Sequence, residues 1–165
     1  MTTKKTLGQT ASQVASGRFL KRFYPFHYLV GEVMEGALRG GELTHHETVI
    51  LWMIHSEGKD GHSLPRKEIE RLIASWYELG SPAITKVLKR MATGSAPLVT
   101  IRDNPSSARE KLVSLTKAGE EEIARMMDRA NTMIDDITVG WTDIEIEDGL
   151  HFLQRVIERV AEIRG

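Results

Sequence analysis

Lysine and arginine side chains are concentrated in the middle of this 165-residue chain. From Ser81 to Ala118 there are seven basic residues and two acids, a net charge of +5, although the whole chain carries only −1. From Gly119 to Gly165 there are five basic residues and twelve acids, a net charge of −7. Because ammonium and guanidinium groups bind phosphate oxygens, a basic segment followed by an acidic one indicates two surfaces with different partners. A solvated surface without a partner is the alternative that charge alone leaves open.

Several of these basic residues fall on a predicted helix that begins at Ser81 and ends near Thr93. Its apolar residues Ile84, Leu88 and Met91 recur at helical spacing, which leaves the basic residues on the opposite face. A helix that reads base edges in the major groove, about 12 Å wide, needs small or polar residues in its first turn and cations that meet phosphates. An amphipathic helix with a solvated basic face is the alternative. The helix residues expected to contact DNA are Ser81, Pro82, Ala83, Thr85, Lys86, Lys89 and Arg90.

After this helix the pattern changes to that of a β-hairpin. Residues 98–102 and 111–115 are typical of strands, and the polar residues 103–107 between them are typical of a turn. A hairpin beside a recognition helix can reach the minor groove or the DNA backbone. A surface hairpin without a ligand is the alternative, and the adjacency of the two elements favours DNA binding. The hairpin residues expected to contact DNA are Arg102, Arg109 and Lys111.

Three predicted helices precede the basic helix and position it. Pro25 is expected to begin the first, because proline is favoured in a first turn, and a pair of glycines ends it. Thr44 and Glu47 form a capping box at the start of the second helix. Its apolar run over residues 49–54 predicts a central, buried position. The third helix is expected to begin at Pro65.

Two long amphipathic helices complete the chain. The first follows Thr116, and the second is capped by Thr142 together with Glu145. Their wide apolar stripes have few partners inside so small a chain, so a second copy is expected to cover them in a homodimer. A monomer that packs these helices on its own core is the alternative.

The order of the predicted elements is that of a winged helix-turn-helix protein. The expected fold class is mainly α with a small β-hairpin wing and with N- and C-terminal dimerisation helices. Residues 1–24 are expected to form a partly flexible arm, residues 25–43 and 117–165 the dimerisation helices, and residues 44–116 the DNA-binding domain.

Four stretches of the chain resemble the MarR family of bacterial winged-helix regulators. They are, in order, LTHHETVILWMI, SPAITKVLKRMA, LVTIRD and REKLVSLTKAGEEE, and the resemblance covers residues 25–164. The last stretch is the most specific, because Leu115 and Thr116 followed by Gly119 match the end of the family's wing. The resemblance implies an obligate homodimer whose recognition helices enter successive major grooves of a near-palindromic site. It also implies a response to a small ligand, as in many members.

The chain departs from the family's pattern in two places. It has Ser107 and Ala108 where the family usually carries Asp-Arg before the wing arginine, and its link Trp76–Gly80 is longer than usual. The positions that match the family's DNA-contacting residues are Arg109, for insertion into the minor groove, and Ala83, Thr85 and Lys86 in the recognition helix.

Four residues with aromatic rings are candidates for binding a small aromatic effector. His27, Tyr28, Trp52 and His55 could line a gap between the first helices and the long helix that carries Met126. The alternative is that the tryptophan and the methionine belong to the hydrophobic core.

Other functions have weaker support. The chain has no cysteine, which excludes disulfides, thiolate metal sites and cysteine nucleophiles. The adjacent His45 and His46 diverge by about 100° on a helix and do not chelate as a pair, so no metal or other cofactor is expected, although His62 with Asp60 leaves a zinc site open. Neither a nucleophile elbow nor a phosphate-binding glycine loop is present, so no enzyme is expected.

The predicted location is the cytoplasm, without a membrane partner. No stretch approaches the roughly 20 apolar residues of a membrane span, and the polar N-terminus lacks the apolar core of a signal peptide. A DNA-binding transcription regulator is therefore the leading interpretation, and the family resemblance implies a repressor. A winged-helix module that binds a protein instead of DNA is the main alternative.

Overall fold

The computed structural model describes residues 11–164, so residues 1–10 of the arm predicted for residues 1–24 lie outside the described residues. The described part is mainly helical, as predicted, and it has a small three-stranded antiparallel sheet that contains the predicted hairpin. The chain comprises two units, Met1–Arg129 and Ala130–Gly165, and the boundary falls inside α6 (Lys117–Ile137). The predicted recognition helix and hairpin both belong to the first unit.

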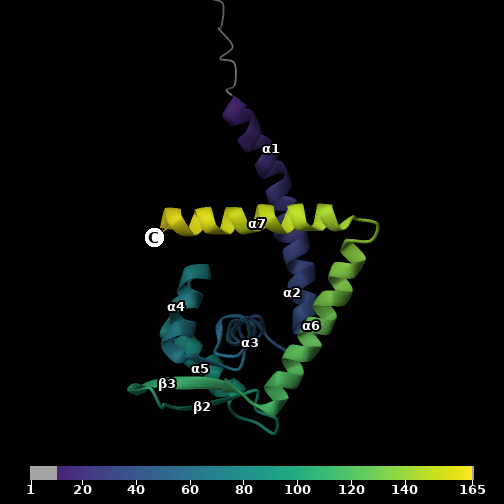
Figure 1. Cartoon of the computed structure of the whole chain (residues 1–165). Coiled ribbons are helices and arrows are strands. Elements are labelled where there is room, and N and C mark those ends of the chain that lie inside the picture. The colour runs from purple at the N-terminus through teal and green to yellow at the C-terminus, as the bar shows by residue number, and fades with distance from the viewer. Residues whose placement is uncertain (1–10, 165) are drawn as a thin grey trace, which may run out of the picture. The chain divides into compact units, whose positions relative to one another are not determined.

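The central element of the first unit is α3 (His45–Glu57), which Figure 1 shows along its axis with α4 and α5 on one side. The Thr44 N–H donates to Glu47 Oε2 at 2.9 Å, so the predicted capping box is confirmed. The predicted central burial of this helix is also confirmed. Its residues with no exposed surface are Ile50, Leu51, Met53 and Ile54.

The N-terminal helical segment differs from the prediction. The helix expected to begin at Pro25 begins instead as α1 (Ala11–Pro25), which continues through a π-helical turn, η1 (Phe26–Val30), into α2 (Gly31–Arg39). Proline has no N–H for the bond to the residue four positions earlier, and the wider turn that follows it lets the Gly31 N–H donate to the Phe26 carbonyl. The predicted end is confirmed, because Gly40 takes the left-handed conformation at φ 59°.

The next two helices form the helix-turn-helix. α4 (Arg66–Trp76) follows Pro65, and α5 (Ser81–Met91) follows an extended Gly80. The link that separates them is residues 77–80 only, because Trp76 still belongs to α4. A link of this length is ordinary for a helix-turn-helix.

The predicted hairpin is confirmed, and its strands are longer than expected. β2 (Val99–Asn104) pairs antiparallel with β3 (Ser107–Leu115), which leaves two residues for the turn. A short strand that the sequence did not predict, β1 (Ser63–Pro65), pairs with the other edge of β3, so the sheet order is β1-β3-β2. Figure 1 shows the hairpin below α3. Val99, Val113 and Leu115 attach it to the core that α3, α4 and α5 share.

The junction between the hairpin and α6 explains the Leu-Thr-x-x-Gly signature. The Gly119 N–H donates to Thr116 Oγ1 at 3.0 Å, which caps α6, while the Thr116 N–H donates to the Leu98 carbonyl at 3.0 Å. A Cβ atom on Gly119 would lie 2.1 Å from the same Leu98 oxygen. Glycine is therefore the residue that lets the first turn of α6 lie against the start of the wing.

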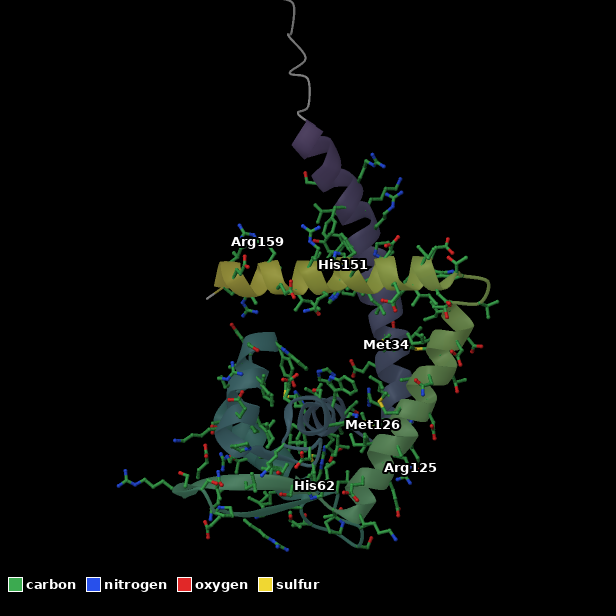
Figure 2. The ribbon with its side chains drawn as sticks, in the orientation of Figure 1. Met34, His62, Arg125, Met126, His151 and Arg159 are labelled. Carbon is green, nitrogen blue, oxygen red and sulfur yellow. The ribbon has the colours of Figure 1, made fainter. Side chains whose placement is uncertain are left out.

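One arginine side chain attaches α6 to the C-terminal end of α2 within the first unit. The Arg129 guanidinium donates to the Ala37 and Leu38 carbonyls, both at 2.8 Å, and to the buried Glu122 at 2.9 Å. Arg125, labelled on α6 in Figure 2, also pairs with Glu122. Carbonyls at a helix end carry partial negative charge, so the arginine acts as a cap for α2.

The second unit contains α7 (Asp143–Arg164). Its predicted start is confirmed, because Thr142 and Glu145 exchange the hydrogen bonds of a capping box. No residue of α7 is buried, although the helix carries a row of large apolar side chains. None of the helices described between residues 11 and 164 is long and apolar enough to cross a membrane. The exposed apolar residues of α7 are Ile144, Leu150, Phe152, Leu153, Ile157, Val160 and Ile163.

We predict that Gly119→Ala lowers the free energy of unfolding by about 1–3 kcal/mol, because the added methyl group meets a backbone oxygen that cannot move freely. Urea unfolding at fixed protein concentration measures the change. Gly36→Ala is the control, because a Cβ atom at Gly36 meets nothing within 4 Å and alanine favours the helix. Equal stability of Gly119→Ala and wild type would contradict the proposed origin of the signature.

Candidate nucleic-acid interface

The predicted recognition helix α5 presents its polar face to solvent. Ile84, Leu88 and Met91 are buried in the core, so the residues between them point away from it. Of the residues expected to contact DNA, Ala83 is half-buried and the others on α5 are exposed. These exposed residues are Ser81, Pro82, Thr85, Lys86, Lys89 and Arg90.

The wing is stabilised by polar contacts near its tip. Lys111 Nζ lies 2.5 Å from Asp103 Oδ1 on the opposite strand. Asn104 Nδ2 donates to Glu110 at 3.0 Å, and its Oδ1 accepts the Ser106 N–H at 3.0 Å. These bonds order the hairpin without the acid that the family usually carries at the tip.

The end of α5 and the start of the wing are joined directly. The Leu98 N–H donates to the Met91 carbonyl at 2.8 Å, so the chain enters β2 beside the last turn of α5. Figure 2 shows nitrogen-ended side chains that stand out from the far end of the hairpin. The exposed Arg102 and Arg109 belong to this hairpin.

Four of the predicted DNA-contacting cations are exposed and unpaired. The side chains of Lys86 and Lys89 on α5, and of Arg102 and Arg109 on the wing, make no hydrogen bond or ion pair within residues 11–164. Unpaired surface cations keep their full capacity to bind an anion and to release its counterions. These four residues are therefore the ones that the structure leaves available to phosphate groups.

Arg90 has a different position from the other cations of α5. Its Nε donates to Glu47 Oε1 at 2.7 Å, and its Nη2 donates to Thr44 Oγ1 at 2.6 Å. The Glu47 side chain is only 11% exposed, so this ion pair joins the end of α5 to the capped start of α3. A contact of Arg90 with DNA stays a prediction, but within the protein Arg90 holds α5 against α3. Lys111 is also paired, with Asp103.

The charge of Glu47 is set by these bonds. Burial alone would raise the pKa of Glu47, but hydrogen bonds from the Thr44 N–H and hydroxyl and from Arg90 hold its pKa below the ordinary value of 4.5. The carboxylate therefore stays ionised near neutral pH and keeps its two partners in place.

A polar cluster that the sequence did not predict lies at the other end of α5. Arg66 and Glu70 on α4 pair at 2.9 Å, and Arg66 also donates to Thr85 Oγ1 at 2.9 Å. Ser81 Oγ donates to Glu70 at 2.8 Å. The spacing of four residues between Arg66 and Glu70 favoured an ion pair on α4. Nothing in the sequence indicated that this ion pair bonds to α5.

The four effector candidates form two separate pairs. The His27 and Tyr28 rings on η1 lie 4.8 Å apart, and the Trp52 and His55 rings on α3 lie 5.8 Å apart. No ring contact joins the two pairs among the described residues. Met126, labelled in Figure 2, belongs to the buried core, whereas Trp52 remains 36% exposed. Binding of an effector by these residues stays a prediction.

The histidines considered as metal ligands pair with single carboxylates. His45 Nδ1 lies 2.8 Å from Glu35, and His62 Nδ1 lies 2.9 Å from Glu120. Across residues 11–164, no group of three or more potential ligands comes together.

Comparisons with solved structures identify the fold. The chain superposes on a transcriptional regulator from Thermotoga maritima with 23% identity, 88% of this chain and 98% of that chain covered, and a TM-score of 0.62. It superposes on a MarR-family protein from Bacillus stearothermophilus with 17% identity, coverage of 93% and 99%, and a TM-score of 0.70. Wild-type MarR from E. coli gives 18% identity, coverage of 85% and 94%, and a TM-score of 0.62.

These neighbours share the winged-helix fold of this chain over nearly their whole length. The predicted fold class is thereby confirmed, and the structural neighbours include MarR-family regulators, as the sequence resemblance indicated. No protein-family model matches the chain, and no curated protein matches its sequence.

We predict that Arg90→Met lowers the free energy of unfolding by about 1–2 kcal/mol, because it leaves the largely buried Glu47 carboxylate without its cation. Lys89→Met is the matched control on the same helix, with a change expected within about 0.5 kcal/mol. Chemical unfolding of the three proteins measures both values. If the two variants were equally stable, Arg90 would not hold α5 to α3.

A second prediction concerns acid. The folded pKa of Glu47 lies below its unfolded value, so its ionised form stabilises the fold above about pH 4.5, and this stabilisation is lost as the pH falls through the folded pKa. The stability difference between wild type and Glu47→Gln should therefore be largest at neutral pH and shrink toward pH 3. Unfolding curves across this range measure it. A difference that did not change with pH would contradict the assignment.

Proposed function

We propose that this chain is a MarR-family transcription regulator that binds double-stranded DNA as a homodimer in the cytoplasm. In this proposal, α5 enters the major groove and the hairpin of β2 and β3 contacts the adjacent backbone or minor groove. The observation that carries it is the set of four exposed, unpaired cations on these two elements, within a fold shared with solved transcriptional regulators. A binding role, and not a catalytic one, accounts for these features.

The first turn of α5 suits the approach to base edges. Ser81 and Thr85 have small polar side chains, and Ala83 is small, so the helix can come close to the groove floor. Lys86 and Lys89 follow on the exposed side, where they would meet phosphates. The wing contributes Arg102 and Arg109, and the latter is the residue proposed for the minor groove.

A homodimer is proposed from the terminal helices. α7 buries no residue, and α2 and η1 bury none either. Each of these helices carries large apolar side chains whose exposure to water is unfavourable, about 25 cal/mol per Å². A second copy of the chain would cover them and would place two recognition helices on one duplex. Residues 25–43 and 117–165 remain the proposed dimerisation segments.

The proposed dimer represses transcription and responds to a small effector. A dimer that occupies two successive major grooves excludes other proteins from that site, which supports repression. The ring pairs on η1 and α3 are the proposed contacts for a small aromatic effector, because flat apolar rings with a few polar atoms suit such a ligand.

We predict that duplex DNA binding weakens steeply with salt, and that Lys86→Ala and Arg109→Ala each weaken it and reduce the salt slope by about one. Fluorescence anisotropy with a duplex selected from a random pool measures affinity, and sedimentation of the complex should show two chains per duplex. Lys59→Ala is the control, a cation exposed outside both elements.

Retention of full affinity by both variants would contradict this docking. Failure of the wild-type protein to bind any duplex at low salt would instead favour a winged-helix module that binds another protein.

A further inference from the structure

The first residue of α4 is held by a carboxylate one turn along the same helix. Arg66 donates from Nε to Glu70 Oε1 at 3.1 Å and from Nη2 to the same oxygen at 2.9 Å. Both side chains are about one-third exposed, at 31% and 29%. The pair therefore lies at the protein surface and is partly shielded from water.

The same pair is bonded to the N-terminal part of α5. Arg66 Nη2 donates to Thr85 Oγ1 at 2.9 Å, and Ser81 Oγ donates to Glu70 Oε1 at 2.8 Å. The Thr85 hydroxyl in turn donates to the Ser81 carbonyl at 2.8 Å. Ser81 and Thr85 are exposed on the proposed DNA-contacting face, so the guanidinium of Arg66 lies at the edge of that face.

Part of the guanidinium remains available. Its Nη1 atom makes no hydrogen bond to any residue between 11 and 164, which leaves two N–H groups for an acceptor. Nε and Nη2 are fixed by Glu70 and Thr85, so the side chain loses little rotational freedom when a further ligand binds. Hydrogen bonds from Ser81 and Arg66 also keep the pKa of Glu70 low against the effect of its burial, so the carboxylate stays charged.

We propose that Arg66 binds a DNA phosphate from α4, and that Glu70 and Thr85 hold its guanidinium in position for this contact. The inference rests on the proposed function and adds an anchor outside the recognition helix. A phosphate is favoured over a base because the first helix of a helix-turn-helix crosses the DNA backbone, while the first turn of the second helix approaches the base edges. The two free N–H groups of Nη1 carry the charge of the guanidinium and can donate to phosphate oxygens.

The proposal gives Glu70 a role that its charge alone would not suggest. An isolated carboxylate beside DNA repels phosphates and weakens binding. Here it is bonded to Arg66 and Ser81, so its removal releases the arginine as well as removing the negative charge. The sign of its effect on affinity therefore depends on whether Arg66 is present.

The test compares variants on two duplexes, one selected by the wild-type protein from a random pool and one shuffled. Arg66→Met should weaken binding to both by about fivefold to thirtyfold and reduce the salt slope by about one. Arg71→Met is the matched control, because Arg71 makes a similar ion pair with Glu68 on α4 but is exposed and bonded to nothing on α5. It should bind within about twofold of wild type.

A double-mutant cycle completes the test. Glu70→Gln should weaken binding in the wild-type background but not in the Arg66→Met background, because only the former has an arginine to release. Unfolding curves of each variant establish that it is folded at the assay temperature.

Three outcomes would overturn the inference. In the first, Arg66→Met binds both duplexes as tightly as wild type. In the second, Arg66→Met loses affinity for the selected duplex only, which would indicate that Arg66 reads a base. In the third, Glu70→Gln binds DNA more tightly in both backgrounds. In each case wild-type binding would leave the proposed function standing. Wild-type protein that binds neither duplex would overturn the proposed function and this inference together.

Discussion

The ion pair between Glu47 and Arg90 fixes the position of the candidate recognition helix. Glu47 closes the capping box of α3, the helix around which the first unit is packed, and the same carboxylate binds the last turn of α5. One partly buried charge thus determines both where α3 begins and how α5 lies on it. Because the carboxylate is 11% exposed, water cannot fully replace its partners, and the arrangement is maintained by the cost of leaving it unpaired.

A second ion pair restrains α5 at its other end. Arg66 and Glu70 on α4 bind Ser81 and Thr85, so a carboxylate from a neighbouring helix supports each end of α5. The buried residues Ile84, Leu88 and Met91 fix its rotation between these two points. What remains exposed and unpaired on the helix is Lys86 and Lys89, at the centre of the outward face. The same packing that makes α5 rigid therefore selects which of its cations can meet an external anion.

Much of this could be predicted from local patterns in the sequence. The capping boxes at Thr44 and Thr142, the amphipathic helix from Ser81 and the hairpin depend on residues within a few positions of each other, and all are confirmed. The start of the first helix was wrong, because a π-helical turn absorbs the missing N–H of Pro25 and lets α1 continue into α2. β1 was missed because its three residues carry no alternating pattern, and its pairing partner lies some fifty positions later.

The candidate site, too, could be predicted from local patterns but not from contacts between distant residues. The residue types on α5 and the wing could be read directly, since exposure follows from helical spacing and from strand alternation. The sequence did not indicate whether a surface cation is already paired. Arg90 pairs with an acid 43 positions earlier in the chain, and Arg66 bonds to Thr85 19 positions later.

The distribution of charge along the sequence nevertheless indicates which kind of partner each surface can bind. The segment after Gly119 carries a net −7, so a DNA duplex would be steered toward the basic segment. The apolar α7 within the acidic segment is suited to a protein partner and unsuited to phosphates. Separation of these two surfaces along the chain would allow one small protein to bind DNA and a second copy of itself at the same time, as the proposed function requires.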